Sequence, residues 1–133
     1  MTKDELIQEA FKAMRHTYSP YSHFPVGAAV LTSDGEVTYG ANIENASYPA
    51  GICGERAALF AAYSKGYTRD DIVALAIVSN GKRIAAPCGV CRQVLHELLN
   101  SDTPIYLATP DEQKTVTMQE ILPMAFGPED LAE

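Results

Sequence analysis

The sequence predicts a single α/β domain spanning residues 1–133, with a mixed sheet of about five strands between helices. The predicted elements run helix, hairpin, helix, strand, helix, strand, strand. Residues 72–78 are mostly apolar and rich in β-branched side chains, which is typical of a central buried strand. A helix follows that strand and leads to the strand at 104–109, so these two strands should be parallel and joined by a right-handed crossover.

The N-terminal part of the chain predicts a helix followed by a hairpin. Thr2 and Glu5 have the spacing of a capping box, and apolar residues then recur at helical intervals. Strands are expected at 26–32 and 36–42, because the Ser-Asp-Gly sequence between them is a turn signal.

The middle of the chain predicts two helices, each preceded by a loop. The loop at 43–52 is rich in Asn, Ser, Pro and Gly, and a helical pattern follows from 53 to about 65. Gly66 suits the C-terminal cap of that helix. A second helix is expected at 88–99, after a loop that ends in proline.

The C-terminal part predicts two strands, a short helix and a tail. The strands at 104–109 and 114–117 are linked by too few residues for a crossover, so they should pair antiparallel. Thr117 and Glu120 form a second capping-box sequence. The tail at 123–133 is expected to rest on this subunit or on a neighbouring one.

All three cysteines lie in two short segments, where each predicted helix begins: Cys53 in one, Cys88 and Cys91 in the other. An odd number of cysteines does not suit a disulfide framework, and thiolates favour zinc. Three protein ligands leave the fourth zinc position open, as in catalytic sites. Glu55 stands two residues from the first ligand, so we expect its carboxylate to serve as a general base there.

A zinc ion held by three thiolates carries a net charge of about −1, which weakens it as a Lewis acid. Some cation must withdraw charge from the sulfurs. Arg56 follows Cys53 by three residues and is the stronger candidate for this role, and Arg92, beside Cys91, is the weaker one.

The motifs Cys53-x-Glu55 and Pro87-Cys88-x-x-Cys91 resemble the signature of the zinc-dependent cytidine deaminase family. The resemblance covers nearly the whole chain and points to the small, homotetrameric branch in which all zinc ligands are cysteines. It implies the three-layer α/β/α fold of that family and one Zn²⁺ per subunit. It also implies a cytoplasmic enzyme of pyrimidine salvage that turns cytidine and deoxycytidine into uridine, deoxyuridine and ammonia.

The same resemblance implies how a nucleoside would be held. Asn42 and Glu44 match residues that bind the ribose hydroxyls, and Phe24 matches the aromatic residue against the pyrimidine. Further expected contacts come from the backbone of two residues and from two aromatic side chains that reach a neighbouring subunit's site, namely Ala46, Gly54, Tyr48 and Phe126. Gly54 stands where the family commonly has alanine, which leaves fine substrate preference open.

The composition excludes several kinds of partner. The formal net charge of −7 argues against nucleic acid and against an anionic membrane surface. No apolar run is long enough to span a bilayer, and the N-terminus has no signal-peptide pattern. With free cysteines, this favours a cytoplasmic location.

Other readings of the motifs remain open at this stage. Cys88 and Cys91 alone could form a thiol–disulfide redox pair, and a structural zinc site would need a fourth ligand from His16, His23 or His96. Deaminases of free bases, nucleotides, tRNA adenine or nucleoside antibiotics share the zinc core. Glu44 beside the sugar favours an unphosphorylated nucleoside, because a carboxylate repels phosphate.

Overall fold

The computed structural model describes residues 1–131 and contains a five-stranded mixed sheet. The strands lie in the order β2 (Val37–Ala41), β1 (Val26–Thr32), β3 (Ile72–Ser79), β4 (Ile105–Ala108) and β5 (Gln113–Val116). The predicted parallel pairing of β3 with β4 and antiparallel pairing of β4 with β5 are confirmed. The antiparallel pairing of β1 with β3 joins the hairpin to this unit. The last two residues of the predicted tail lie outside the described residues.

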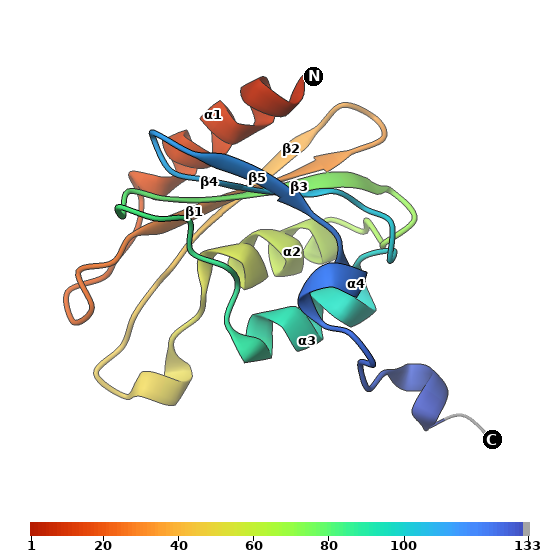
Figure 1. Cartoon of the computed structure of the whole chain (residues 1–133). Coiled ribbons are helices and arrows are strands. Elements are labelled where there is room, and N and C mark those ends of the chain that lie inside the picture. The colour runs from red at the N-terminus through yellow and green to blue at the C-terminus, as the bar shows by residue number, and fades with distance from the viewer. Residues whose placement is uncertain (132–133) are drawn as a thin grey trace.

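Helices cover both faces of the sheet, so the predicted α/β/α layering is confirmed (Figure 1). The helix α1 (Lys3–Met14) packs on one face, where Leu6 and Ile7 meet the apolar residues of β3. The other face carries α2 (Gly54–Ser64) and α3 (Gly89–Leu98), with α4 (Met118–Ile121) beside α3. Two separate apolar clusters therefore hold the sheet between its helices, and each contributes the burial energy of its own face.

Both predicted capping boxes form at their helix starts. Thr2 and Glu5 exchange hydrogen bonds at the start of α1, and Thr117 and Glu120 do so at the start of α4. Gly66 has a φ of +99° just after α2, the left-handed conformation that favours glycine in a C-terminal cap. These caps could be predicted from the sequence because each depends on residues that are close together in the chain.

A glycine lets α2 lie directly on the sheet. A Cβ atom at Gly40 in β2 would lie 2.5 Å from the carbonyl oxygen of Gly54 and still closer to the backbone nitrogen of Ala58. Both are backbone atoms of α2, so neither can turn aside. The close approach fixes the start of α2 against the hairpin.

We expect Gly40→Ala to lower the free energy of unfolding by about 1–3 kcal/mol, the usual cost of overpacking. Urea unfolding followed by circular dichroism measures the change. Gly89→Ala is the matched control, because a Cβ at Gly89 meets nothing within 4 Å. Equal stability of the Gly40→Ala and Gly89→Ala proteins would contradict the packing argument.

The hairpin turn is tied to the far end of α2 by a tyrosine. The hydroxyl of Tyr67 lies 2.5 Å from a carboxylate oxygen of Asp34 and 2.6 Å from one of Glu36. Hydrogen bonds from Thr32 and then from Tyr67 lower the pKa of Asp34 from 3.8 to about 2. The hairpin and the end of α2 are thus held together by an ionised carboxylate.

Acid should release this contact. Because the folded-state pKa of Asp34 is depressed, its contribution to stability is complete above about pH 4 and is lost as pH falls towards 2. Urea unfolding at pH 7 and at lower pH should show wild type losing more stability than Tyr67→Phe, which lacks the shared hydroxyl. Parallel loss in the two proteins would rule out this contact as a source of acid sensitivity.

Among the described residues, no helix combines the length and the apolar character that crossing a membrane requires.

Candidate metal centre and active site

Two of the three cysteines occupy equivalent places in the fold. Cys53 is the N-terminal cap of α2 and Cys88 is the N-terminal cap of α3, while Cys91 lies in the first turn of α3. The sulfurs of all three lie within 4.8 Å of one another, and those of Cys53 and Cys88 are 4.0 Å apart. Helix N-termini present free N–H groups and a partial positive charge, which stabilise thiolates.

The sulfur positions fit a zinc ion. Three sulfurs at about 2.3 Å from one tetrahedral ion would be about 3.8 Å apart, close to the separation of Cys53 from Cys88. Within residues 1–131, these three side chains form the cluster of metal-binding groups, and no histidine joins it. The donor set therefore suits Zn²⁺ with one position left for another ligand, and neither a redox pair nor a closed structural site accounts for all three sulfurs.

Glu55 brings a carboxylate to the sulfur cluster. It lies in the first turn of α2, only 4% exposed, and its Oε1 accepts a hydrogen bond from the Cys91 thiol at 3.0 Å. Burial raises the pKa of Glu55 to about 6, against the lowering effect of the bond from Cys91. A carboxyl group with a pKa near neutrality can both accept and return a proton.

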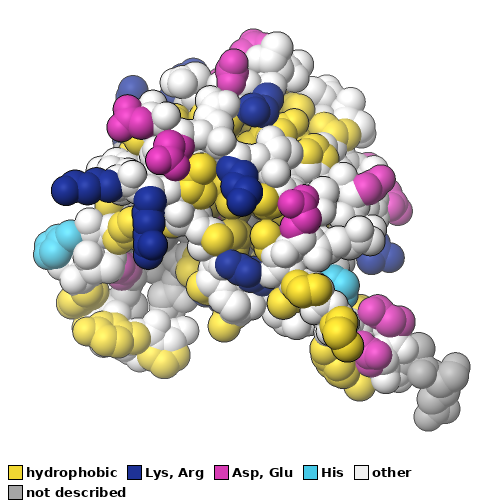
Figure 2. All heavy atoms as spheres, in the orientation of Figure 1, with side chains coloured by type: hydrophobic (Ala, Val, Ile, Leu, Met, Phe, Trp, Pro, Cys, Tyr) yellow, Lys and Arg dark blue, Asp and Glu magenta, His cyan; other side chains and the backbone are white. Residues whose placement is uncertain are grey.

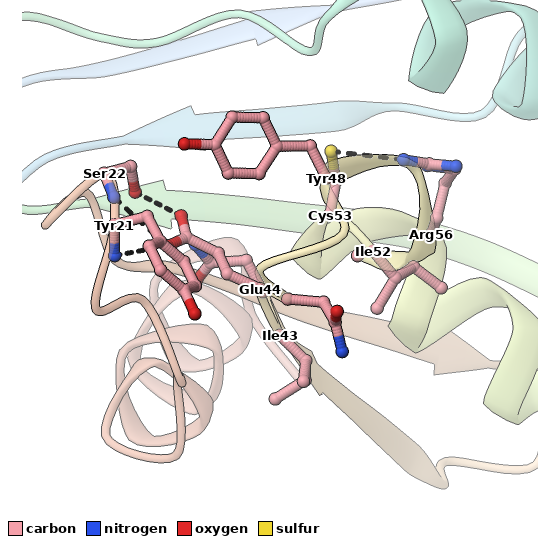
Figure 3. Close-up of a pocket in the computed structure, with 11 residues that line it drawn as sticks. Tyr21, Ser22, Ile43, Glu44, Tyr48, Ile52, Cys53 and Arg56 are labelled. Atoms are coloured by element: carbon pink, nitrogen blue, oxygen red, sulfur yellow. Dashed lines mark hydrogen bonds between the residues drawn. The ribbon is translucent and has the colours of Figure 1, made fainter.

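Arg56 contacts a sulfur, as its spacing predicted. Its Nη2 lies 3.5 Å from Sγ of Cys53, one helical turn away (Figure 3). Hydrogen bonding from Cys91 and then from Arg56 lowers the pKa of Cys53 to about 5, so this thiol ionises first. Hydrogen bonding to Cys53, together with burial, raises the pKa of Cys91. The guanidinium thus lies where it can withdraw charge from the sulfur of Cys53.

Arg92 does not share this role. Its Nε donates to the carbonyl oxygen of Pro87 at 2.7 Å, and its Nη1 donates to that of Ile121, also at 2.7 Å. Neither bond reaches a sulfur, so the sequence-based suggestion that Arg92 withdraws charge from the ligands is wrong. Spacing alone could not show it, because the second acceptor lies 29 residues away.

Two adjoining cavities open beside the sulfurs. The larger, of about 470 Å³, is lined by the tyrosines Tyr21 and Tyr48 and by Arg56. The smaller, of about 260 Å³, is lined by Phe24, Glu55 and Cys88. Both are also lined by the same four residues, Ser22, Asn42, Glu44 and Cys53. A ligand in either cavity therefore meets Asn42 and Glu44 together with the sulfur site.

The side chain of Asn42 is held in place by the protein itself. Its Oδ1 accepts from Thr17 Oγ1 at 2.5 Å and from the backbone N–H of Val26 at 2.9 Å. Its Nδ2 donates to the carbonyl oxygen of Phe24 at 2.9 Å. One N–H remains available, so Asn42 can offer a ligand a donor but no acceptor.

Glu44 organises the loop that carries Phe24. One carboxylate oxygen accepts from the backbone N–H groups of Tyr21 and Ser22 at 3.0 and 3.1 Å, and the other accepts from the Ser22 hydroxyl (Figure 3). The bond from the Ser22 side chain is the main cause that lowers the pKa of Glu44. Glu44 is thus ionised at neutral pH and accepts further donors at the cavity wall.

Sequence reasoning missed two serines of the smaller cavity. Ser22 bonds Glu44, and Ser79 lies at the end of β3, 3% exposed, with its hydroxyl bonded to no protein group among the described residues. The chain gives little warning of either, although Ser22 lies in the irregular stretch that includes Phe24. Their places depend on which strand and loop ends meet at this edge.

Of the other predicted contact residues, two line the smaller cavity, one lines the larger cavity and two line neither. Gly54 and Phe24 line the smaller cavity, and a Cβ at Gly54 would come within 2.9 Å of the Val26 carbonyl oxygen. Tyr48 lines the larger cavity, is 76% exposed and packs edge-to-face on Tyr21. Ala46 and Phe126 are exposed and line neither cavity in the single chain. Their contact with substrate stays a prediction.

The fold and the site together define a class of protein. An α/β/α domain with an open three-thiolate site at two helix starts, and a buried carboxylate beside it, is a zinc-dependent hydrolytic enzyme.

Comparison with known proteins narrows this class. Residues 1–107 match the family model described as cytidine and deoxycytidylate deaminase zinc-binding region. A cytidine deaminase of Halalkalibacterium halodurans is 51% identical over 132 residues, which cover 98% of each chain. A cytidine deaminase of Mycobacterium tuberculosis is 41% identical over 122 residues, covering 92% of this chain and 87% of the relative.

Solved structures agree. The crystal structure of cytidine deaminase from Burkholderia pseudomallei has a TM-score of 0.91 at 42% identity, covering 95% of this chain and 100% of its own. The Mycobacterium tuberculosis structure has a TM-score of 0.80 at 39% identity, covering 96% of this chain and 98% of its own. This chain belongs to the cytidine and deoxycytidylate deaminase family, and its cofactor is Zn²⁺.

Proposed function

We propose that this protein hydrolyses cytidine and deoxycytidine to uridine and deoxyuridine with release of ammonia. The observation that carries the proposal is the convergence of Cys53, Cys88 and Cys91 beside the buried carboxylate of Glu55, in a chain whose relatives are cytidine deaminases. We propose these three cysteines as the zinc ligands, Glu55 as the catalytic acid and base, and residues 1–133 as one catalytic domain.

Glu55 carries the protons in the proposed reaction. Zinc, when bound, lowers the pKa of a coordinated water molecule and makes its oxygen nucleophilic near neutral pH. Glu55 takes a proton from the attacking water and passes it to N3 of the pyrimidine while the water oxygen bonds to C4. Glu55 then takes the remaining proton from the new C4 hydroxyl and delivers it to the amino group, so the C4–N bond breaks, the C4 carbonyl forms and ammonia leaves. A carboxyl pKa of about 6 suits transfer in both directions.

The residues that line both cavities would hold the sugar. Asn42 offers its one remaining N–H to a hydroxyl oxygen, and ionised Glu44 accepts a hydrogen bond from a hydroxyl group. The ring of Phe24 would lie against the base, and the backbone of Gly54 and Ala46 would contact its edge. The carboxylate of Glu44 disfavours a phosphorylated sugar by charge repulsion.

We further propose a homotetramer with shared sites. Tyr48 and Phe126 are exposed, at 76% and 57%. Met124 and Leu131, which lie in the same C-terminal segment as Phe126, are exposed as well. Apolar side chains are visible on that projecting segment in Figure 2. Burial of such residues between copies would bring Tyr48 and Phe126 against a neighbouring subunit, and we propose that they reach its cavity. A cytoplasmic role in pyrimidine salvage fits thiol ligands, which require a reducing environment.

A cytidine assay with and without chelator tests the function. We expect the zinc-loaded protein to decrease the near-ultraviolet absorbance of cytidine with equimolar release of ammonia. A strong chelator should abolish turnover and added Zn²⁺ should restore it. Deoxycytidylate is the comparison substrate. Turnover of deoxycytidylate but not of cytidine, or no turnover by a fully zinc-loaded protein, would overturn the proposal.

A further inference from the structure

One loop beside the metal centre is barely held by hydrogen bonds. Residues 80–87 connect β3 to α3, and Ala85, Ala86 and Pro87 from this loop line the smaller cavity. Within the described residues 1–131, the loop makes no backbone–backbone hydrogen bond. The hydrogen bond from Arg92 to the carbonyl oxygen of Pro87 is the one that a side chain makes to it. Apart from the packing of Ile84 against the apolar core and the burial of Pro87, this bond is what fixes the end of the loop that enters the metal centre.

The residue that follows this loop is the least enclosed of the three cysteines. Cys88 is exposed, whereas Cys91 is fully buried in α3 and Cys53 has Arg56 against its sulfur. Cys88 is also a cap residue, with extended backbone angles, so the helix does not fix the peptide bond that precedes it. The direction of that peptide decides where the Cys88 sulfur points.

Arg92 holds that peptide from inside α3. Its guanidinium donates to Pro87 through Nε and to Ile121, the last residue of α4, through Nη1, both at 2.7 Å. The planar guanidinium presents these donors in a fixed fork, which the single ammonium of lysine does not reproduce. The same side chain thereby locks the loop end against both α3 and α4.

We propose that Arg92 is a positioning residue that holds Cys88 in its zinc-binding orientation by anchoring the carbonyl group of Pro87. Its hydrogen bonds reach no sulfur, and it acts through the peptide that joins Pro87 to Cys88. The proposal rests on the zinc site of the proposed function, but not on which nucleoside that site hydrolyses.

Zinc release measures this role without reference to activity. The zinc-loaded Arg92→Met protein, mixed with the chromogenic chelator 4-(2-pyridylazo)resorcinol, should lose zinc about 10–100-fold more readily than wild type, the usual cost of removing a group that orients a ligand. Arg92→Lys should fall between the two, because it keeps the charge but loses the fork. Hydrogen exchange at the backbone amide of residue 92, whose N–H donates to the carbonyl oxygen of Cys88 at 2.9 Å, should quicken in the same order.

The neighbouring residue supplies a matched control. Gln93 Nε2 donates to the carbonyl oxygen of Phe126 at 2.7 Å, so Gln93→Met releases part of the C-terminal segment and leaves Pro87 anchored. Zinc release from Gln93→Met should stay within about twofold of wild type, well below the 10–100-fold range.

The possible results distinguish anchoring of Pro87 by Arg92 from docking of the C-terminal segment as the cause of zinc retention. Wild-type zinc release and exchange in a folded Arg92→Met protein would overturn it. Equal acceleration in Arg92→Met and Gln93→Met would also overturn it, since docking of the C-terminal segment would then be the cause. If Arg92→Met did not fold, Arg92→Lys would decide by the same two measurements. A wild-type protein that fails to deaminate cytidine would refute the proposed function and leave this zinc measurement standing.

Discussion

Replacing Glu55 with glutamine is expected to lower kcat for cytidine by about 10²–10⁴-fold, the usual contribution of general acid–base catalysis. The glutamine amide has nearly the same shape as the carboxyl group but neither accepts nor returns a proton at neutral pH. Glu55 is buried and its Oε1 lies 3.0 Å from the sulfur of Cys91, while the other carboxylate of the cavities, Glu44, is held by the backbone of Tyr21 and Ser22. Steady-state kinetics with cytidine measures the loss.

The zinc content of the Glu55→Gln protein shows whether its loss of kcat comes from missing proton transfer or from missing metal. Glu55→Gln should bind one Zn²⁺ per subunit, because the three sulfurs are untouched. Glu97→Gln, an exposed carboxylate on α3, should keep wild-type kinetics and serves as the control. A zinc-replete Glu55→Gln protein with wild-type kcat would remove Glu55 from the mechanism, and loss of zinc would assign it to ligand positioning.

Replacing Arg56 with glutamine is expected to lower kcat by about 10–100-fold while the fold persists. The variant removes the positive charge that lies 3.5 Å from the sulfur of Cys53 and that helps lower the pKa of that thiol. With the full negative charge of three thiolates on it, the metal would activate water less well at neutral pH. The pH at which kcat reaches half its maximum should therefore rise in Arg56→Gln.

The shift in the pH profile separates this electrostatic role from a packing role. Arg56→Lys keeps a positive charge and should shift the profile less than Arg56→Gln. The exposed Arg69 supplies the control for loss of one positive charge, and Arg69→Gln should leave the profile unchanged. Wild-type kcat and an unshifted profile in zinc-loaded Arg56→Gln would exclude Arg56 from charge compensation.

The contacts around the three sulfurs that the sequence anticipated depend on short spacings. Cys88 and Cys91 share one helix start, and Arg56 reaches Cys53 because residues three apart lie on one face of a helix. The capping boxes of α1 and α4 and the glycine after α2 are likewise local. The strand pairings followed from link lengths and the handedness of crossovers.

The parts that were missed join residues far apart in the chain. Arg92 bonds Ile121, and Asn42 bonds Thr17 across 25 residues, so neither partner follows from a spacing rule. Protein groups occupy all but one of the hydrogen-bonding positions of the Asn42 side-chain amide, so this amide can only donate to a ligand. Ser79, whose hydroxyl has no hydrogen-bond partner among residues 1–131, lines the cavity because β3 ends there.

By itself, the sequence determined the order of the helices and strands, the three candidate thiolate ligands, the carboxylate beside them and the family. These features are encoded in residue type and in intervals of a few residues, over which backbone geometry is nearly fixed. Tertiary structure alone decided which groups the remaining side chains contact, and hence that Arg92 holds a loop end and that Glu44 organises the loop bearing Phe24. Such contacts depend on how the sheet brings distant loop ends together, and no short stretch of sequence contains that information.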